Sequence, residues 1–119
     1  MLEGLYGADV LVGRDGADRF VYRSDYDSSP TARDIILDFS RAQGDKVDLA
    51  GIDAKVHATG NQAFTFVDQS QFTGEGQLRF FQLNGDTIIE ANTDNSVPGA
   101  DMVIVLDTLV TPKGLDFFL

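Results

Sequence analysis

Glycine and aspartate recur in a fixed pattern near the start of the chain, in a form that could bind a metal ion. Residues 4–12 and 13–21 align as two nine-residue units of the form G-x-x-G-x-D-x-U-x, in which U is a large apolar residue. An Asp carboxylate beside the carbonyl groups of a tight turn supplies the oxygen ligands that Ca²⁺ prefers. The candidate metal-site residues in the two units are Gly7, Asp9, Gly13, Gly16 and Asp18.

Each unit predicts a six-residue turn followed by a three-residue strand whose middle residue, Leu11 or Phe20, points inward. Both units lack the second glycine of the full pattern, which is replaced by Leu5 and by Arg14. In a roll of such units, successive turns lie on opposite edges, so a calcium ion is held between turns that are two units apart. The alternative to a complete site is therefore a pair of tight turns whose partner units lie upstream of Met1.

Longer strands are predicted after the repeats. Residues 34–39 form a predominantly apolar block that predicts a buried strand, and residues 46–49 predict a short one. Further on, apolar side chains alternate with polar ones, Asn84-Gly85-Asp86 predicts a hairpin turn, and residues 102–106 are expected to close the sheet. The predicted fold is all-β, with a short parallel β-roll that continues into an antiparallel β sheet or sandwich.

The composition excludes several kinds of partner and several kinds of site. A formal charge of −10, from 19 acidic against 9 basic residues, disfavours binding to nucleic acid or to an anionic membrane and favours cations. The chain has no Cys, so disulfides, thiolate catalysis and cysteine zinc sites are excluded. Its one histidine, His57, cannot build a catalytic zinc centre by itself and is expected in an exposed loop. No apolar run approaches the roughly 20 residues that span a bilayer.

Taken together, these blocks resemble the C-terminal region of serralysin-type metalloproteases and of other RTX proteins that leave bacteria by type I secretion. Besides the two repeats, the resemblance rests on residues 16–22, 34–39, 44–49, 60–66 and 115–119. It implies calcium held between the turns of a parallel β-roll, and an extracellular location reached through an ATP-driven exporter that reads the uncleaved C-terminus. It also implies that any catalytic domain lies upstream, so the chain itself is expected to be non-catalytic.

The resemblance adds two aspartates to the candidate metal ligands. In the block that spans residues 34–39, an aspartate can stack beneath the last turn of the roll and replace a missing repeat, which makes Asp34 and, more weakly, Asp38 candidates. The alternative is that both are surface carboxylates that flank a strand. Residues 92–101 also carry oxygen atoms at alternate positions, but they lack the glycine of a calcium loop at the required place, so a polar hairpin loop is favoured.

The last four residues match the short export motif of these proteins, an acidic residue followed by three large apolar ones. These residues are Asp116, Phe117, Phe118 and Leu119. A structural alternative is that Phe117 and Leu119 dock on the sheet as a final strand, and both roles can hold for a signal that is read before folding. The expected organisation is thus a pair of degenerate repeats in residues 1–23, a β domain in residues 24–110 and a secretion tail in residues 111–119.

The leading hypothesis is a non-catalytic calcium-binding module that supports calcium-dependent folding and type I secretion of a larger extracellular protein, such as a metalloprotease. Its expected partners are the exporter and the upstream part of the parent chain. The alternative is a module that binds an acidic polysaccharide, as in secreted alginate epimerases. In that case a basic stripe would hold the ligand, formed by Arg14, Arg19, Arg23 and Arg33. Pairing of these arginines with surface Asp is the competing explanation.

Overall fold

The computed structural model describes residues 1–4, 7–55, 59–94 and 99–119, and their regular secondary structure is almost entirely β. Two short 3-10 helices, η1 and η2, are the only helical elements in this part of the chain. The elements in chain order are β1 (Val10–Leu11), β2 (Arg19–Val21), η1 (Asp25–Ser28), β3 (Asp34–Ile36), β4 (Lys46–Asp48), β5 (Thr65–Phe66), β6 (Gln77–Leu83), β7 (Asp86–Asn92), β8 (Met102–Leu106), η2 (Gly114–Asp116) and β9 (Phe117–Phe118). The all-β prediction is confirmed.

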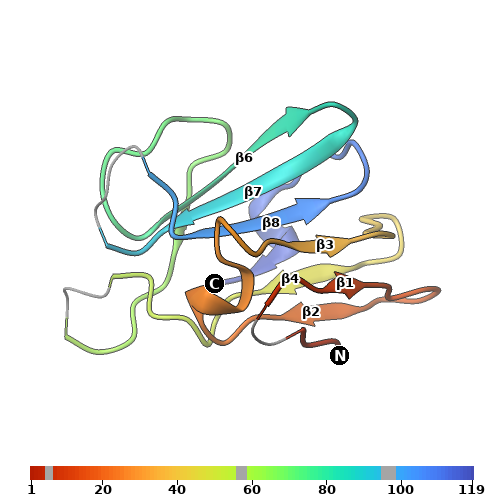
Figure 1. Ribbon diagram of the computed structural model, residues 1–119, viewed down its shortest axis with the longest axis horizontal. Coiled ribbons are helices and arrows are strands. Elements are labelled where there is room, and N and C mark those ends of the chain that lie inside the picture. The colour runs from red at the N-terminus through yellow and green to blue at the C-terminus, as the bar shows by residue number, and fades with distance from the viewer. Residues whose placement is uncertain (5–6, 56–58, 95–98) are drawn as a thin grey trace.

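The strands form two sheets, and the first four strands alternate between them. A six-stranded sheet has the order β1-β3-β8-β7-β6-β5, and a three-stranded sheet has the order β2-β4-β9. β1 pairs with β3, and β2 pairs with β4, in both cases parallel. In Figure 1, β1 and β3 run in one direction and β2 and β4 in the other, as the chain winds from one sheet to the other. This winding is consistent with the expected parallel β-roll.

The segments that contain β3 and β4 lack the glycine pattern, but they continue the winding of the two repeats. Val10 is the register partner of Ile35, and Phe20 is the partner of Val47. The inward residues of the repeats, Leu11 and Phe20, are buried as predicted, and so are their neighbours Ile36 and Val47. The structure therefore supplies a neighbouring turn for each repeat from within the chain.

The antiparallel part of the fold is a hairpin joined to the roll by β8. Asn84 and Gly85 both have positive φ, 52° and 87°, as a tight hairpin turn between β6 and β7 requires. β8 pairs antiparallel with β7 and parallel with β3. The expectation that residues 102–106 would close the sheet is wrong, because β8 lies in its interior. The strand predicted over residues 34–39 is also shorter than expected and ends at Ile36.

One hydrophobic core fills the space between the two sheets. Phe20, Val47, Leu78 and Ile104 are among its fully or almost fully buried side chains. The C-terminal strand β9 contributes Phe117 to the same core. The proposed division at residues 23 and 110 remains a prediction, but strands from all three segments share the two sheets.

Candidate metal-binding turns and the C-terminal strand

Asp9 and Asp34 meet where the first repeat stacks on the turn before β3. The backbone N–H of Asp9 donates to Oδ1 of Asp34 at 2.9 Å, and the N–H of Ile35 donates to the carbonyl of Asp9 at 2.9 Å. Asp34 is completely buried. The Oδ2 atoms of both aspartates are buried too, and neither has a hydrogen-bond partner among the described residues. The contact brings together two of the carboxylates that were predicted as ligands.

Gly4 makes room for the two free oxygen atoms. A Cβ added at Gly4 would lie 2.8 Å from Oδ2 of Asp9 and 2.9 Å from Oδ2 of Asp34, which is closer than real Cβ atoms approach other atoms. Both oxygens therefore face the same backbone position. Burying two carboxylate oxygens without donors is unfavourable unless a proton or a cation lies between them. The donor set, two Asp oxygens beside a glycine turn, fits a hard cation such as Ca²⁺.

The electrostatics of this cluster disfavour ionisation. The pKa of Asp34 is raised to about 6, mainly by burial. The negative charge of Asp9 also raises this pKa, whereas the hydrogen bond from the Asp9 N–H lowers it. Burial likewise raises the pKa of Tyr22, and the charge of Asp34 adds to the effect. The Tyr22 hydroxyl has no hydrogen bond of standard geometry within the described part of the chain. A bound cation would offset the electrostatic repulsion between the Asp34 and Asp9 carboxylates.

The second repeat stacks on a different turn at the opposite edge of the roll. The N–H of Asp18 donates to Oδ1 of Asp45 at 2.8 Å, and the N–H of Ser40 donates to Oδ2 of Asp45 at 2.9 Å. Oδ2 of Asp18 is buried, lacks a partner among the described residues and lies beside Gly13, 2.5 Å from the place of an added Cβ. Because Asp45 uses both oxygens to hold backbone N–H groups, this edge has one free oxygen where the first edge has two.

Asp38 holds the second repeat in place through backbone hydrogen bonds. Its Oδ1 accepts the N–H of Gly13 at 2.8 Å, and its Oδ2 accepts the N–H of Arg14 at 2.5 Å. Both oxygens are therefore engaged by the turn, and a metal-binding role for Asp38 stays a prediction. Gly7 and Gly16 occupy the turns with φ of 93° and 95°, a conformation that favours glycine, so the backbone explains why glycine recurs at this position of the repeat.

Other predicted sites are less complete in the structure. Within the described ranges, no three or more Asp, Glu, His or Cys side chains gather closely enough to hold a metal by themselves. His57 lies outside the described residues, as do residues 95–98 of the polar loop. At the end of that loop, Oδ2 of Asp101 accepts the N–H of Thr93 at 2.8 Å.

Three of the four arginines in the hypothetical basic stripe make separate side-chain contacts in the structure. Arg23 pairs with Glu3, and Arg19 lies 3.7 Å from Asp48. Nε of Arg33 donates to the carbonyl of Pro30. The stripe stays a prediction.

The C-terminal motif is packed into the fold. β9 pairs parallel with β4, and the N–H of Leu49 donates to the carbonyl of Phe118 at 2.8 Å. Asp116 is buried, and its Oδ2 accepts from Nε of Arg41 at 2.5 Å and from the N–H of Lys113 at 2.7 Å. The ring of Phe117 packs against that of Phe66, with centroids 5.2 Å apart. The final strand was one of the two roles considered for this segment, and the structure contains it.

Three residues that shape the candidate site were not among the predicted metal-site residues, namely Gly4, Tyr22 and Asp45. Gly4 opens the first repeat, so the pattern itself contained the signal. Asp45 occupies the same place relative to Val47 as Asp18 does relative to Phe20, a match that becomes visible once β2 and β4 are known to pair. Tyr22 carries no such signal, because only the folding of the chain brings its hydroxyl toward Asp34.

The chain matches a known protein family. A family model described as Peptidase M10 serralysin C terminal matches residues 3–111 of the 119 residues. No curated protein sequence matches the chain significantly. A search of the described residues for a helix of sufficient length and apolar character to cross a membrane finds none.

Proposed function

Because the chain belongs to the family of peptidase M10 serralysin C-terminal domains, we propose that it is the calcium-binding module that supports folding and type I export of a larger extracellular protein. Domains of this family are distinct from the protease domain of serralysins. The proposal therefore assigns the chain a role in secretion and folding, and leaves catalysis to another part of the parent protein.

The observation that carries this proposal is the pair of free oxygens of Asp9 and Asp34. Oδ2 of Asp9 and Oδ2 of Asp34 are buried without a hydrogen bond of standard geometry among the described residues, and a folded protein keeps such atoms buried only at a free-energy cost. Calcium bound at this position would neutralise both charges through direct ligation. Asp9 and Asp34 would hold the ion together with backbone oxygens of the first turn, and Asp18 would contribute at the opposite edge of the roll.

This arrangement couples metal binding to folding. Without calcium, the repulsion between Asp9 and Asp34 opposes stacking of β1 on β3, so the chain stays loosely folded where free calcium is low. At a hundredfold excess of calcium over the dissociation constant, binding stabilises the native state by about 2.7 kcal/mol. Export into a medium with millimolar calcium would then favour folding outside the cell.

The packed tail fits the same sequence of events. An exporter would read residues 116–119 in the unfolded chain, and after export the same residues would form β9 against β4. The Asp116 carboxylate would then leave water and pair with Arg41, and Phe117 would become buried in the core. The signal and the final strand are thus two uses of one segment at different times.

Thermal melts in chelator and in millimolar calcium test the proposal. Calcium should raise the midpoint of the wild-type chain, and Asp34→Asn should abolish most of that rise because it removes a charged ligand. Asp68→Asn is the matched control, since Asp68 is exposed, lies away from the roll and has a φ of 54° that Asn tolerates. An equal midpoint in chelator and in calcium for the wild type would contradict the proposal.

A further inference from the structure

Arg19 and Lys46 are direct register partners across the parallel pair β2 and β4. Their neighbours Phe20 and Val47 point into the core, so the alternation of a strand places Arg19 and Lys46 together on the outer face of the three-stranded sheet. Like charges directly opposite each other on one face of a sheet are destabilising. In a chain with a formal charge of −10, this local excess of positive charge needs an explanation.

Neither cation is closely neutralised. Nε of Arg19 lies 3.7 Å from Oδ2 of Asp48, which is longer than a charge-assisted hydrogen bond, and half of the Arg19 side chain is exposed. Nζ of Lys46 donates to the backbone carbonyl of Leu115, and no carboxylate in the described part of the chain lies within salt-bridge distance of it. Both side chains therefore keep donors that an added anion could use.

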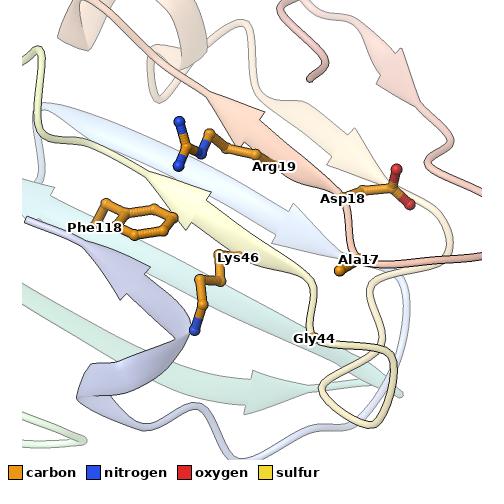
Figure 2. Close-up of a pocket in the computed structure, with 6 residues that line it drawn as sticks. All are labelled: Ala17, Asp18, Arg19, Gly44, Lys46 and Phe118. Carbon is orange, nitrogen blue, oxygen red and sulfur yellow. The ribbon is translucent and has the colours of Figure 1, made fainter.

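An aromatic ring from the C-terminal strand organises the two cations. The ring centroid of Phe118 lies 4.5 Å from Cζ of Arg19 and 5.8 Å from Nζ of Lys46. Beside it is an open pocket of about 200 Å³, lined by Ala17, Asp18, Arg19, Gly44, Lys46 and Phe118 (Figure 2). The carboxylate of Asp18 points away from the Phe118 ring in this view. The pocket is thus lined by two positively charged residues together with small and aromatic apolar surfaces, and the ends of the Arg19 and Lys46 side chains point in opposite directions in Figure 2.

We propose that this pocket binds a small monoanionic ligand that carries a carboxylate beside a compact ring or chain. The planar guanidinium of Arg19 can donate two parallel hydrogen bonds to a carboxylate, and Lys46 adds a second positive charge. Phe118 and Ala17 contact the uncharged part of the ligand. Oδ2 of Asp48, 3.7 Å from Nε of Arg19, would repel a second negative charge, so the pocket favours a carboxylate over a phosphate dianion.

The proposal is independent of calcium binding by Asp9 and Asp34, because none of the residues that contact the ligand belongs to that pair. It also does not need the stripe of four arginines, since it uses Arg19 alone of that set and adds Lys46. Two sources share the recognised chemistry, a uronic-acid sugar and the free carboxylate of a peptide. The pocket is open on the outer face, so either can enter.

Titration of the ¹⁵N-labelled chain, followed by NMR in saturating calcium, tests the proposal. Glucuronate and N-acetylglycine represent the two sources, glucose is the neutral control, and inorganic phosphate tests the preference for a monoanion. At least one carboxylate should give saturable shifts centred on Arg19, Lys46 and Phe118. Arg19→Gln and Lys46→Gln should each weaken that binding by about tenfold or more, since each removes charge-assisted hydrogen bonds.

Arg33→Gln is the matched control, because Arg33 is an exposed arginine directly before β3 of the six-stranded sheet. It should leave the affinity unchanged. Binding by glucuronate alone would identify a sugar acid, and binding by N-acetylglycine alone would identify a peptide terminus. The proposal is overturned if neither carboxylate saturates, if phosphate binds more tightly than both, or if the wild type and the two pocket variants respond equally while all retain the native spectrum.

Discussion

Oδ2 of Asp9 and Oδ2 of Asp34 come to the same glycine from aspartates that are 25 positions apart in the sequence. Both atoms are buried, and both lack a hydrogen-bond donor among the described residues. Their approach concentrates negative charge where the first repeat stacks on the turn before β3. The response of the domain to calcium, to pH and to substitutions nearby should therefore depend strongly on this contact.

The pH dependence of stability should carry the signature of Asp34. Its pKa is raised from 3.8 to about 6 in the folded state, so between these values the folded chain binds more protons than the unfolded one. This group alone therefore makes the domain more stable as the pH falls from about 7 toward 4 and less stable as the pH rises through 6. We expect the difference in unfolding free energy between wild type and Asp34→Asn, measured in chelator by urea melts, to change in that window.

Saturating calcium should remove most of this dependence, because ligation favours the ionised form of Asp34 in the folded state. A difference between the two proteins that stays constant from pH 7 to pH 4 would contradict the assignment. Asp68→Asn again serves as the control, since Asp68 is an exposed carboxylate outside this cluster.

Gly4→Ala should destabilise the domain and weaken its response to calcium. The new Cβ would lie within 3 Å of both free oxygens and would force the two aspartates apart. Overpacking of this kind costs about 1–3 kcal/mol. Chemical denaturation with and without calcium measures both effects. Gly114→Ala is the matched control, because an added Cβ there meets no atom within 4 Å, and a similar loss in both variants would argue against a special role for Gly4.

Arg41→Met should destabilise the folded tail. Asp116 is 3% exposed and accepts a hydrogen bond from Arg41, so the substitution leaves a buried carboxylate whose remaining donor among the described residues is the Lys113 N–H. The loss of a hydrogen bond to a charged group is expected to lower the free energy of unfolding by about 1–3 kcal/mol. Carboxypeptidase digestion should also release the last residues faster than in the wild type. If Arg33→Met speeds the digestion equally, the Arg41 contact does not hold the tail.

The two phenylalanines of the tail should behave differently. Phe117 is buried against Phe66, so Phe117→Ala should cost about 3–5 kcal/mol. Phe118 lies on the outer face and is 37% exposed, so Phe118→Ala should cost much less. Thermal melts of the purified chains measure this order. Equal losses would mean that β9 does not pack as the structure describes.

Several features follow from local sequence because they depend on short-range chemistry. The glycine–aspartate repeats predict turns with positive φ at Gly7 and Gly16, and the structure has them. Asn84-Gly85 predicts the hairpin turn, since both residues accept positive φ at little cost. The apolar positions Leu11 and Phe20 are buried as the repeat pattern requires.

The partners of these elements depend on contacts between residues far apart in the chain, and local patterns contain no record of them. The sequence predicts residues 102–106 at the end of the sheet, whereas the parallel pairing with β3 puts β8 inside it. Asp34 is a stacking candidate from the sequence, but only the folded chain shows that Asp34 and Asp9 direct free oxygens toward Gly4.

The amino-acid sequence by itself indicated the all-β class and the family, and it predicted the candidate calcium ligands, because turn chemistry and composition act over a few residues. The tertiary structure decided which carboxylates are free to act. Both carboxylate oxygens of Asp38 and of Asp45 accept hydrogen bonds from backbone N–H groups. Asp9 and Asp34 each have one buried carboxylate oxygen without a hydrogen bond among the described residues. This difference between the two pairs of aspartates follows from strand register. The register places Asp38 and Asp45 against backbone N–H groups, and it places Asp9 and Asp34 beside each other.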